Sequence, residues 1–225
     1  MSAPTTACTK CGITILTDTA VKNGGKCFPC AHGTRGRIEE GRRWAAERRR
    51  RERMTREAVE RIGRKEHPCL GDFVAEDDPV GVLWAFLVAA LFRDEASRPH
   101  IEILTPTGKA IWFAGVLDGE VCNGGFHQYF SNSSGKYAHE TLFALYELRA
   151  VAVADLLQRA IHTFPAKRVP EQRKERNDEL GKTNAETLDA LDTEYYALAK
   201  VSGEAVFEQI LSYMRQRPAE RIIKD

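Results

Sequence analysis

The amino-acid sequence predicts a mainly α-helical fold, in which a small cysteine module and a long charged helix precede an all-α helical C-terminal domain. Three observations predict it. Four of the six cysteines lie in the first 30 residues, a proline-free stretch rich in Arg and Glu follows, and the remaining sequence repeats apolar residues at helical spacing. We therefore divide the chain into residues 1–33, 34–66 and 67–225.

The cysteines of the first segment form two C-x2-C pairs separated by fifteen residues: Cys8, Cys11, Cys27 and Cys30. This spacing is typical of a structural zinc site. Four thiolates complete a tetrahedron around Zn²⁺ and leave no open position for catalysis. A segment of about 30 residues buries too little apolar surface to fold alone, so we expect one zinc ion to stabilise it.

The sequence disfavours two other uses of these cysteines. Two disulfides would suit a secreted protein, but the first residues form no apolar signal segment, so we expect reduced cysteines and a cytoplasmic protein. A thioredoxin-like pair would need a C-x2-C at the start of a helix in a βαβ unit. His32 is expected to be a loop histidine, because four cysteines already satisfy the metal.

The first segment also carries strand and turn patterns. Ile13 to Thr17 reads as a short strand, and Asn23-Gly24 reads as a hairpin turn. Together with the cysteines, these features predict a zinc-ribbon arrangement.

The second segment predicts a helix from about Gly36 to Arg64, roughly 40 Å long at ~1.5 Å per residue. Glu precedes Arg by four residues in a repeated, stabilising order. These pairs are Glu39–Arg43, Glu47–Arg51, Glu52–Arg56, Glu57–Arg61 and Glu60–Arg64. No apolar residue occurs from Glu47 to Arg53, so the middle is expected to be solvated or bound to something acidic.

Charge is distributed unevenly, although the formal net charge is only +1. Residues 31–65 hold 13 basic and 6 acidic side chains, whereas residues 66–225 hold 17 basic and 25 acidic ones. Such asymmetry indicates binding to other molecules or attraction between the halves. The 13-residue apolar run from Val80 to Phe92 is too short to cross a bilayer, so we expect a buried helix and no membrane partner.

The third segment predicts a series of helices. Asp78 and Pro79 form a start signal for a helix over 79–93, and Thr107 is a candidate cap for a helix near 108–120. Further helices are expected near residues 136–149, 151–164, 170–180, 184–199 and 203–216. Residues 101–104 are the only strand candidate, and Cys69 and Cys122 read as small buried hydrophobes.

The stretch from Glu120 to Gly135 is the most unusual part of this segment. Asn123-Gly124-Gly125 should break one helix, and Phe126, Tyr129 and Phe130 should form one apolar face of the next. Asn132-Ser133-Ser134-Gly135 should end that helix, with Ser133 or Ser134 capping the one that follows.

This stretch resembles the signature of the bacterial DMP-type DNA-mimic protein domain family, and the resemblance covers about residues 70–217. The motif residues that carry it are Asn123, Gly124, Gly125, Phe126, Gln128, Tyr129, Phe130, Asn132, Ser133, Ser134 and Gly135. The resemblance implies an all-α domain, often dimeric, without catalytic residues that can be carried over. At least one member presents carboxylates like DNA phosphates and occupies a DNA-binding protein. Cys122, the cysteine module and the Arg-rich helix depart from the family pattern.

The resemblance and the charge favour an interaction protein whose acidic domain binds a protein partner, which DNA mimicry would make a DNA-binding protein. The candidate carboxylates crowd one region: Glu171, Glu175, Asp178, Glu179, Glu186, Asp189, Asp192 and Glu194. The alternative is an ordinary solvated face, because four basic residues lie among them. These are Arg173, Lys174, Arg176 and Lys182.

A second function remains open for the charged helix, which could contact nucleic-acid phosphates together with the cysteine module. The candidate contact residues are Arg42, Arg43, Arg48, Arg49, Arg50, Arg51 and Arg53. The alternatives are a charged spacer between two modules, or a basic helix that lies on the acidic domain and masks both.

An enzyme centred on the same unusual stretch is the third hypothesis. An acid–base cluster could be drawn from His127, Gln128, Tyr129, His139 and Glu140. The sequence contains no nucleophile elbow, no P-loop, no zinc-protease helix and no paired-carboxylate motif. We therefore expect no enzymatic activity.

Overall fold

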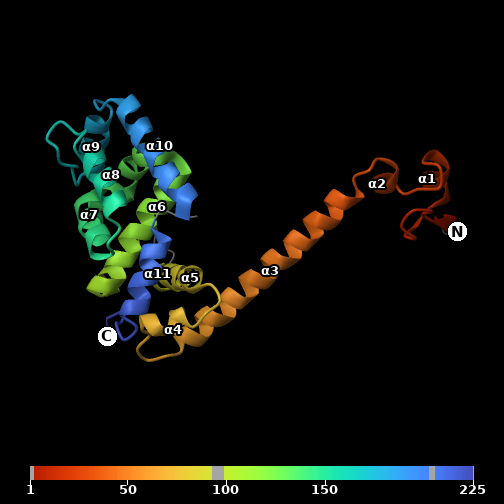
Figure 1. Ribbon diagram of the computed structural model, residues 1–225, viewed down its shortest axis with the longest axis horizontal. Coiled ribbons are helices and arrows are strands. Elements are labelled where there is room, and N and C mark those ends of the chain that lie inside the picture. The colour runs from red at the N-terminus through yellow and green to blue at the C-terminus, as the bar shows by residue number, and fades with distance from the viewer. Residues whose placement is uncertain (1–2, 93–98, 203–205, 225) are drawn as a thin grey trace. The chain divides into compact units, whose positions relative to one another are not determined.

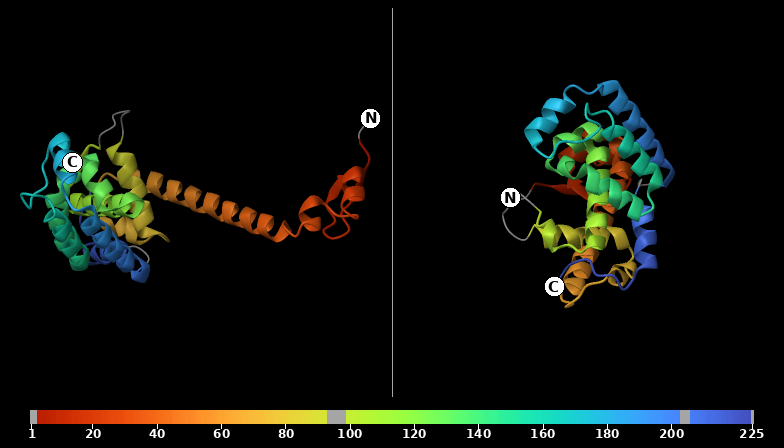
Figure 2. Two further views of the ribbon diagram at one scale, coloured as in Figure 1. Left: turned by 90° about the horizontal axis from the view of Figure 1, so that it is seen from above. Right: turned by 90° about the vertical axis from the view of Figure 1, so that its left-hand side faces the viewer.

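The computed structural model describes residues 3–92, 99–202 and 206–224 and confirms the mainly α fold (Figures 1 and 2). The chain divides into two compact units, Met1–Met54 and Thr55–Asp225, which are described separately below. The division falls within the long charged helix and not in a loop.

The first unit contains a small antiparallel hairpin of β1 (Thr5–Ala7) and β2 (Thr14–Leu16). The strand predicted at Ile13 to Thr17 is confirmed as β2, whereas β1 lies outside the prediction. Helix α1 (Thr17–Lys22) follows β2 directly, and α2 (Phe28–Ala31) begins at the second cysteine pair.

The predicted hairpin turn at Asn23-Gly24 is wrong. The turn of the hairpin is residues 8–13, whereas Asn23 ends helix α1. The Gly25 N–H donates to the Ala20 carbonyl at 2.7 Å, and Gly24 and Gly25 both have positive φ, at 58° and 79°. A left-handed glycine after the last turn is a common helix ending, so the same residues close a helix here.

The predicted charged helix is α3 (Arg35–Gly63). Of the pairs expected along it, Glu47–Arg51 is confirmed at 3.4 Å, and Arg48 pairs with Glu52 in the opposite order at 3.6 Å. Beyond Met54 the helix belongs to the second unit, where Ala58 and Ile62 are buried. That end is held by packing, whereas the part before it relies on its own backbone and charge pairs.

The second unit is built around α6 (Pro106–Ser131), which packs against α7 (Ala138–Glu147), α9 (Arg173–Leu180) and α10 (Ala185–Ser202). The remaining elements are α4 (Leu70–Val74), α5 (Pro79–Leu91), η1 (Ile101–Ile103), η2 (Ser133–Tyr137), α8 (Val151–Ile161) and α11 (Phe207–Gln216). In the part of the chain that the structure describes, no helix has both the length and the hydropathy that a membrane span needs.

Two helix starts test the capping predictions. Asp78 caps α5 as expected, and its Oδ1 accepts the Gly81 N–H at 3.0 Å. The cap predicted at Thr107 is wrong, because Thr105 caps α6 by accepting the Gly108 N–H at 3.1 Å, with Pro106 at the first helical position. The hydroxyl of Thr107 instead donates to the Glu220 carboxylate.

Three other expectations need correction. The predicted strand at residues 101–104 is wrong, because Ile101–Ile103 form a 3₁₀ turn and Leu104 makes only a single bridge, with Ile223. Helix α9 begins at Arg173, three residues later than predicted. Cys122 is exposed and Cys69 is half-buried, so neither is the buried hydrophobe that we expected.

The predicted break lies inside α6, where Gly124 and Gly125 leave helical geometry. Gly125 has φ of 72°, and a Cβ there would lie 2.0 Å from the Asp192 Oδ2 of α10. Beyond the break, Phe126, Tyr129 and Phe130 are at most 1% exposed, which confirms the predicted apolar face.

Replacing Gly125 by Ala should therefore lower the free energy of unfolding of the second unit by about 2–4 kcal/mol, through backbone strain and the collision with Asp192. Gly119→Ala is the matched control on the same helix, because that position is exposed and a Cβ there meets nothing within 4 Å. It should be neutral or stabilise by up to about 1 kcal/mol. Urea denaturation followed by circular dichroism measures both, and equal effects would contradict the assignment.

Candidate functional site

The four predicted cysteines come together in the first unit. Cys8 and Cys11 lie in the turn of the hairpin, while Cys27 precedes α2 and Cys30 lies within it. Their sulfur atoms all lie within 4.8 Å of one another, and none forms a disulfide. The hairpin turn and the start of α2 thus form a cluster that could hold a metal ion.

The spacing of the sulfurs fits a tetrahedral ion. Metal–thiolate bonds of about 2.3 Å in a tetrahedron place the sulfurs about 3.8 Å apart. The Sγ atoms of Cys11 and Cys27 are 3.8 Å apart, far beyond the roughly 2.05 Å of a disulfide. His32 lies outside this four-residue group, and its ring packs against Phe28 at 4.1 Å.

The thiols of the cluster differ in their electrostatic environment. The backbone N–H of Cys27 donates to Cys8 Sγ at 3.2 Å and lowers the pKa of Cys8 to about 6. Burial raises the pKa of Cys30 to about 11, and the neighbouring thiols add to this effect. Because only thiolates bind metals well, a metal ion has to displace the proton on Cys30 at neutral pH.

The cluster has a basic neighbour that the spacing of the cysteines does not predict. Arg35, the first residue of α3, donates from Nη2 to Cys11 Sγ at 2.7 Å and from Nε to Cys30 Sγ at 3.2 Å. Glu39, one turn along α3, accepts from Arg35 Nη1 at 3.0 Å. A positive charge therefore lies directly against the sulfur cluster.

The polar side chains of the central motif bond to one another inside the second unit. Glu120 accepts from Gln128 Nε2 at 2.7 Å, from Asn132 Nδ2 at 2.8 Å and from Ser134 Oγ at 3.1 Å. Asn123 Nδ2 donates to Gln128 Oε1 at 3.1 Å. These bonds join the two halves of the broken helix to the turn that follows it.

The motif serine prediction is wrong in detail. Ser134 bonds back to Glu120 and does not cap the following turn, and no side-chain cap begins η2. Asn132 ends α6 as predicted.

A buried arginine completes this arrangement. Arg176 of α9 is 1% exposed and donates to the carbonyls of Phe130 at 2.6 Å and Asn132 at 2.9 Å. Its Nη1 donates to two further carbonyls in the loop before α9. A Cβ at Gly135 would lie 2.8 Å from Arg176 Nε, so glycine allows the guanidinium to approach. Arg176, which the sequence places among solvated basic residues, belongs to the interior.

The residues of the supposed acid–base cluster face different environments. Tyr129 is buried, and its hydroxyl donates to Thr141 at 2.8 Å. Burial raises the pKa of this phenol above its usual range. Gln128 is bonded to Glu120, while His127 is exposed. Tyr129 and Gln128, two members of the supposed cluster, therefore have structural roles.

The candidate carboxylates also separate into two groups. Asp192 accepts the Phe126 N–H at 2.8 Å, and Glu194 pairs with Arg159 through two bonds of 2.7 Å, so both have intramolecular roles. The other six lie on or beside α9 and α10, and all but the half-buried Glu179 are exposed. They are Glu171, Glu175, Asp178, Glu179, Glu186 and Asp189.

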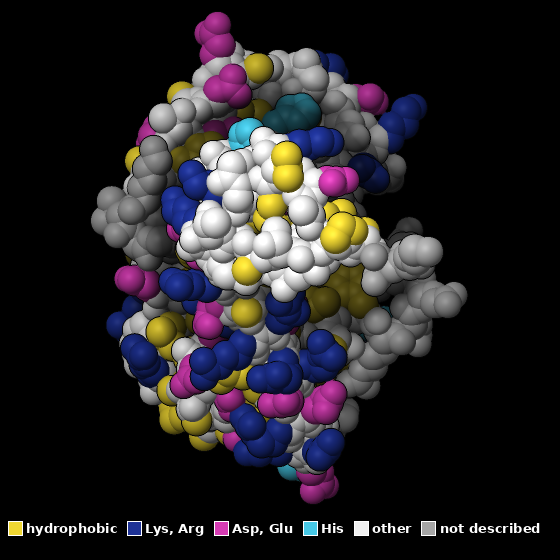
Figure 3. Space-filling model, turned by 90° about the vertical axis from the view of Figure 1, so that its right-hand side faces the viewer, with side chains coloured by type: hydrophobic (Ala, Val, Ile, Leu, Met, Phe, Trp, Pro, Cys, Tyr) yellow, Lys and Arg dark blue, Asp and Glu magenta, His cyan; other side chains and the backbone are white. Residues whose placement is uncertain are grey.

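The candidate arginines of α3 are all exposed: Arg42, Arg43, Arg48, Arg49, Arg50, Arg51 and Arg53. Trp44 lies among them and is 69% exposed. Figure 3 shows Lys and Arg side chains interspersed with Asp and Glu on the face that it draws. Along α3, Arg48 pairs with Glu52 and Arg51 pairs with Glu47.

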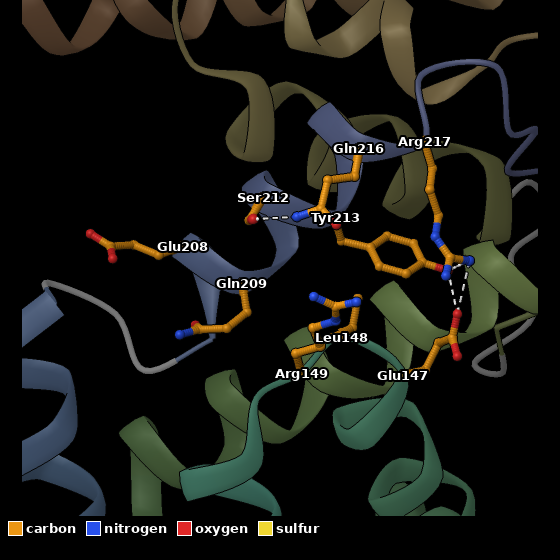
Figure 4. Close-up of a pocket in the computed structure, with 9 residues that line it drawn as sticks. All are labelled: Glu147, Leu148, Arg149, Glu208, Gln209, Ser212, Tyr213, Gln216 and Arg217. Atoms are coloured by element: carbon orange, nitrogen blue, oxygen red, sulfur yellow. Dashed lines mark hydrogen bonds and ion pairs between the residues drawn. The ribbon is translucent and has the colours of Figure 1, made fainter.

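A hollow of about 260 Å³ lies between the end of α7 and α11 (Figure 4). Arg217 pairs with Glu147 at 2.9 Å and lies 4.5 Å from the centre of the Tyr213 ring. Figure 4 shows this ion pair beside the Tyr213 ring, among the residues that line the hollow.

A family model described as DMP19-like protein matches residues 102–217, which include the broken helix, Arg176 and the acidic helices. No curated protein and no solved structure matches the chain.

Replacing Cys27 by Ala should abolish tight metal binding, because three thiolates no longer close the tetrahedron. Titration of the metal-free protein with Co²⁺ should show thiolate charge-transfer absorption for wild type and little for the variant. Since the second unit is compact by itself, its thermal unfolding should not change. Cys122→Ala, at an exposed cysteine outside the cluster, should bind Co²⁺ like wild type. Full binding by Cys27→Ala would contradict the assignment.

Proposed function

Because this chain belongs to the DMP19-like protein family, we propose that it is a zinc-containing, non-enzymatic interaction protein. In this proposal the cysteine cluster holds one structural zinc ion. The acidic surface of α9 and α10 binds a protein partner with a basic surface of the kind that contacts DNA. The observation that carries the proposal is the inward orientation of Arg176, which leaves the carboxylates of α9 less neutralised than the sequence suggests.

The choice of zinc rests on the donor set. Four thiolates at tetrahedral spacing favour Zn²⁺ or iron over hard ions such as Mg²⁺ and Ca²⁺. Four protein ligands leave no position for water or substrate, so the ion would stabilise the fold of this small unit. Among the residues that the structure describes, the partly buried apolar residue packed against the buried cysteines is Ile15, so apolar burial adds little to this cluster.

The non-enzymatic part of the proposal rests on the use of the motif. Glu120 accepts hydrogen bonds from Gln128, Asn132 and Ser134, and Tyr129 bonds within the core. Side chains engaged in this way position the backbone of α6 and η2. The motif therefore has a structural explanation that requires no substrate.

The positions of the basic side chains among the carboxylates support the proposal of an acidic binding surface. Arg176 is buried, and Arg173 donates from Nε to the Ser131 carbonyl at 2.9 Å. Lys174 and Lys182 remain exposed. Arg173 is exposed as well and keeps its charge, so six carboxylates lie among three exposed basic residues. This excess of negative charge favours a basic partner and steers its approach through long-range attraction.

Neutralising four of these carboxylates tests the partner proposal. The variant carries Glu171→Gln, Glu175→Gln, Asp178→Asn and Glu186→Gln, and its matched control changes exposed carboxylates outside α9 and α10, as Glu66→Gln, Asp77→Asn, Glu140→Gln and Glu208→Gln. The immobilised full chain is used to capture proteins from a lysate of the native cell. Duplex DNA should then compete for the captured proteins and release them. The variant should capture them at least about tenfold less, and the control should match wild type. Capture that resists DNA, or equal loss in both variants, would contradict mimicry.

Nucleic-acid binding by α3 is the second candidate, and exposed Trp44 favours it. An aromatic ring among arginines is the combination with which proteins stack bases and contact phosphates of single strands. Arg48 and Trp44 contribute to one open hollow on the helix together with Gly41 and Ala45. Small residues beside the indole leave room for a planar base.

For this candidate, binding of a single-stranded oligonucleotide should weaken steeply with salt. Replacing Arg48, Arg49, Arg50 and Arg51 by Gln should lower the slope of log affinity against log salt by about 0.7 for each lost phosphate contact. The matched control changes exposed basic residues of the second unit: Lys167, Arg168, Lys174 and Lys182, each to Gln. Fluorescence anisotropy across a salt series measures the slopes. Absence of binding at low salt would indicate that α3 is a spacer.

A further inference from the structure

The guanidinium of Arg35 contacts the sulfur atoms of three of the four cysteines, whereas a solvated surface arginine would point into water. Beside its contacts to Cys11 and Cys30, its Nη2 lies 3.7 Å from Cys27 Sγ. We propose that Arg35 is a positioning residue of the metal centre, which bridges the sulfur ligands and offsets part of their negative charge. This inference rests on the proposed zinc site.

Charge is the first reason for this role. Four thiolates around a divalent ion leave two negative charges in excess, and one guanidinium removes half of that excess. The guanidinium has several N–H groups in a fixed plane, so it can donate to two sulfurs at once while a lysine could reach one of them well. N–H bonds to thiolates are charge-assisted and stronger than those between neutral groups.

Orientation is the second reason. Glu39 accepts from Nη1, the nitrogen that faces away from the sulfurs, and this bond fixes the plane of the guanidinium. The side chain of Arg35 is only 27% exposed, unlike that of Arg37, which is exposed. A cysteine ligand, an arginine and a glutamate thus form a chain of bonds from the cluster to the first turn of α3.

Position in the sequence is the third reason. Arg35 is the first residue of α3, and the preceding Thr34 donates its N–H to the Pro29 carbonyl of α2 at 2.9 Å. The cluster is therefore tied to the beginning of α3 through both the backbone and Arg35. Metal binding should order the first turn of α3, and loss of the metal should loosen it.

Protection of Cys11 follows from the same contact. Cys11 is the exposed cysteine of the cluster, and the shortest Arg35 contact is to its sulfur. A thiolate that accepts such a bond is a weaker nucleophile, because its charge is partly neutralised. Without Arg35, a metal-bound Cys11 should react faster with alkylating agents.

The test compares Arg35→Gln with Arg37→Gln, a matched change two residues away on the exposed side of α3. Zinc affinity is measured by competition with a chromophoric chelator, and alkylation of the zinc-loaded chain by N-ethylmaleimide is followed by mass spectrometry. We expect Arg35→Gln to bind zinc about 10- to 100-fold more weakly, as is usual when a partner of a metal ligand is lost, and to alkylate faster at Cys11. Arg37→Gln should match wild type in both.

The outcomes separate this inference from the proposed function. If wild type binds one zinc ion and Arg35→Gln binds it equally well, the role of Arg35 is overturned while the zinc site stands. If wild type binds no zinc, the proposed site itself is wrong. If Arg35→Gln takes up no metal at all, Arg35→Lys decides. Weakened but measurable binding by Arg35→Lys supports the charge role, and complete loss overturns it.

Discussion

The second unit depends on the interruption of α6 at Gly125. A continuous helix would point Phe126, Tyr129 and Phe130 in other directions, whereas the break turns all three into the core. The interruption frees the Phe126 N–H, and Asp192 of α10 accepts it at 2.8 Å. Burial raises the pKa of Asp192 above its usual value, although this bond and nearby His127 oppose the shift. One broken helix thus requires a glycine, a carboxylate and a second helix at fixed places.

The two units rely on different stabilising interactions. The second unit has a continuous apolar core that extends from Ala58 to Ile222 along the chain. The first has a cluster of three buried cysteines with Ile15, and its hairpin has three residues in each strand. Apolar burial accounts for the fold of the larger unit, whereas the proposed metal ligation by the cysteines would stabilise the smaller one.

Local sequence patterns predicted those structural features that depend only on residues close together in the chain. The four-cysteine spacing, the Asp78-Pro79 start of α5, the extent of α3 and the glycine break were all readable, because each is decided within a few residues. Thr105-Pro106 has the same form as Asp78-Pro79, and it is the helix start that the Thr107 prediction misses. What could not be read depends on tertiary contacts. Nothing local distinguishes the buried Arg176 from its exposed neighbours, or shows that Arg35 turns toward sulfur.

The positions of the tryptophans have a spectroscopic consequence. Trp84 and Trp112 stack on each other in the second unit with ring centres 4.9 Å apart, whereas Trp44 stands exposed on α3. Stacked, largely buried indoles and a hydrated indole emit at different wavelengths and are quenched to different degrees by aqueous iodide. The red edge of the intrinsic emission therefore comes mainly from one known position on the charged helix. The natural chain carries its own optical label there, without any added dye.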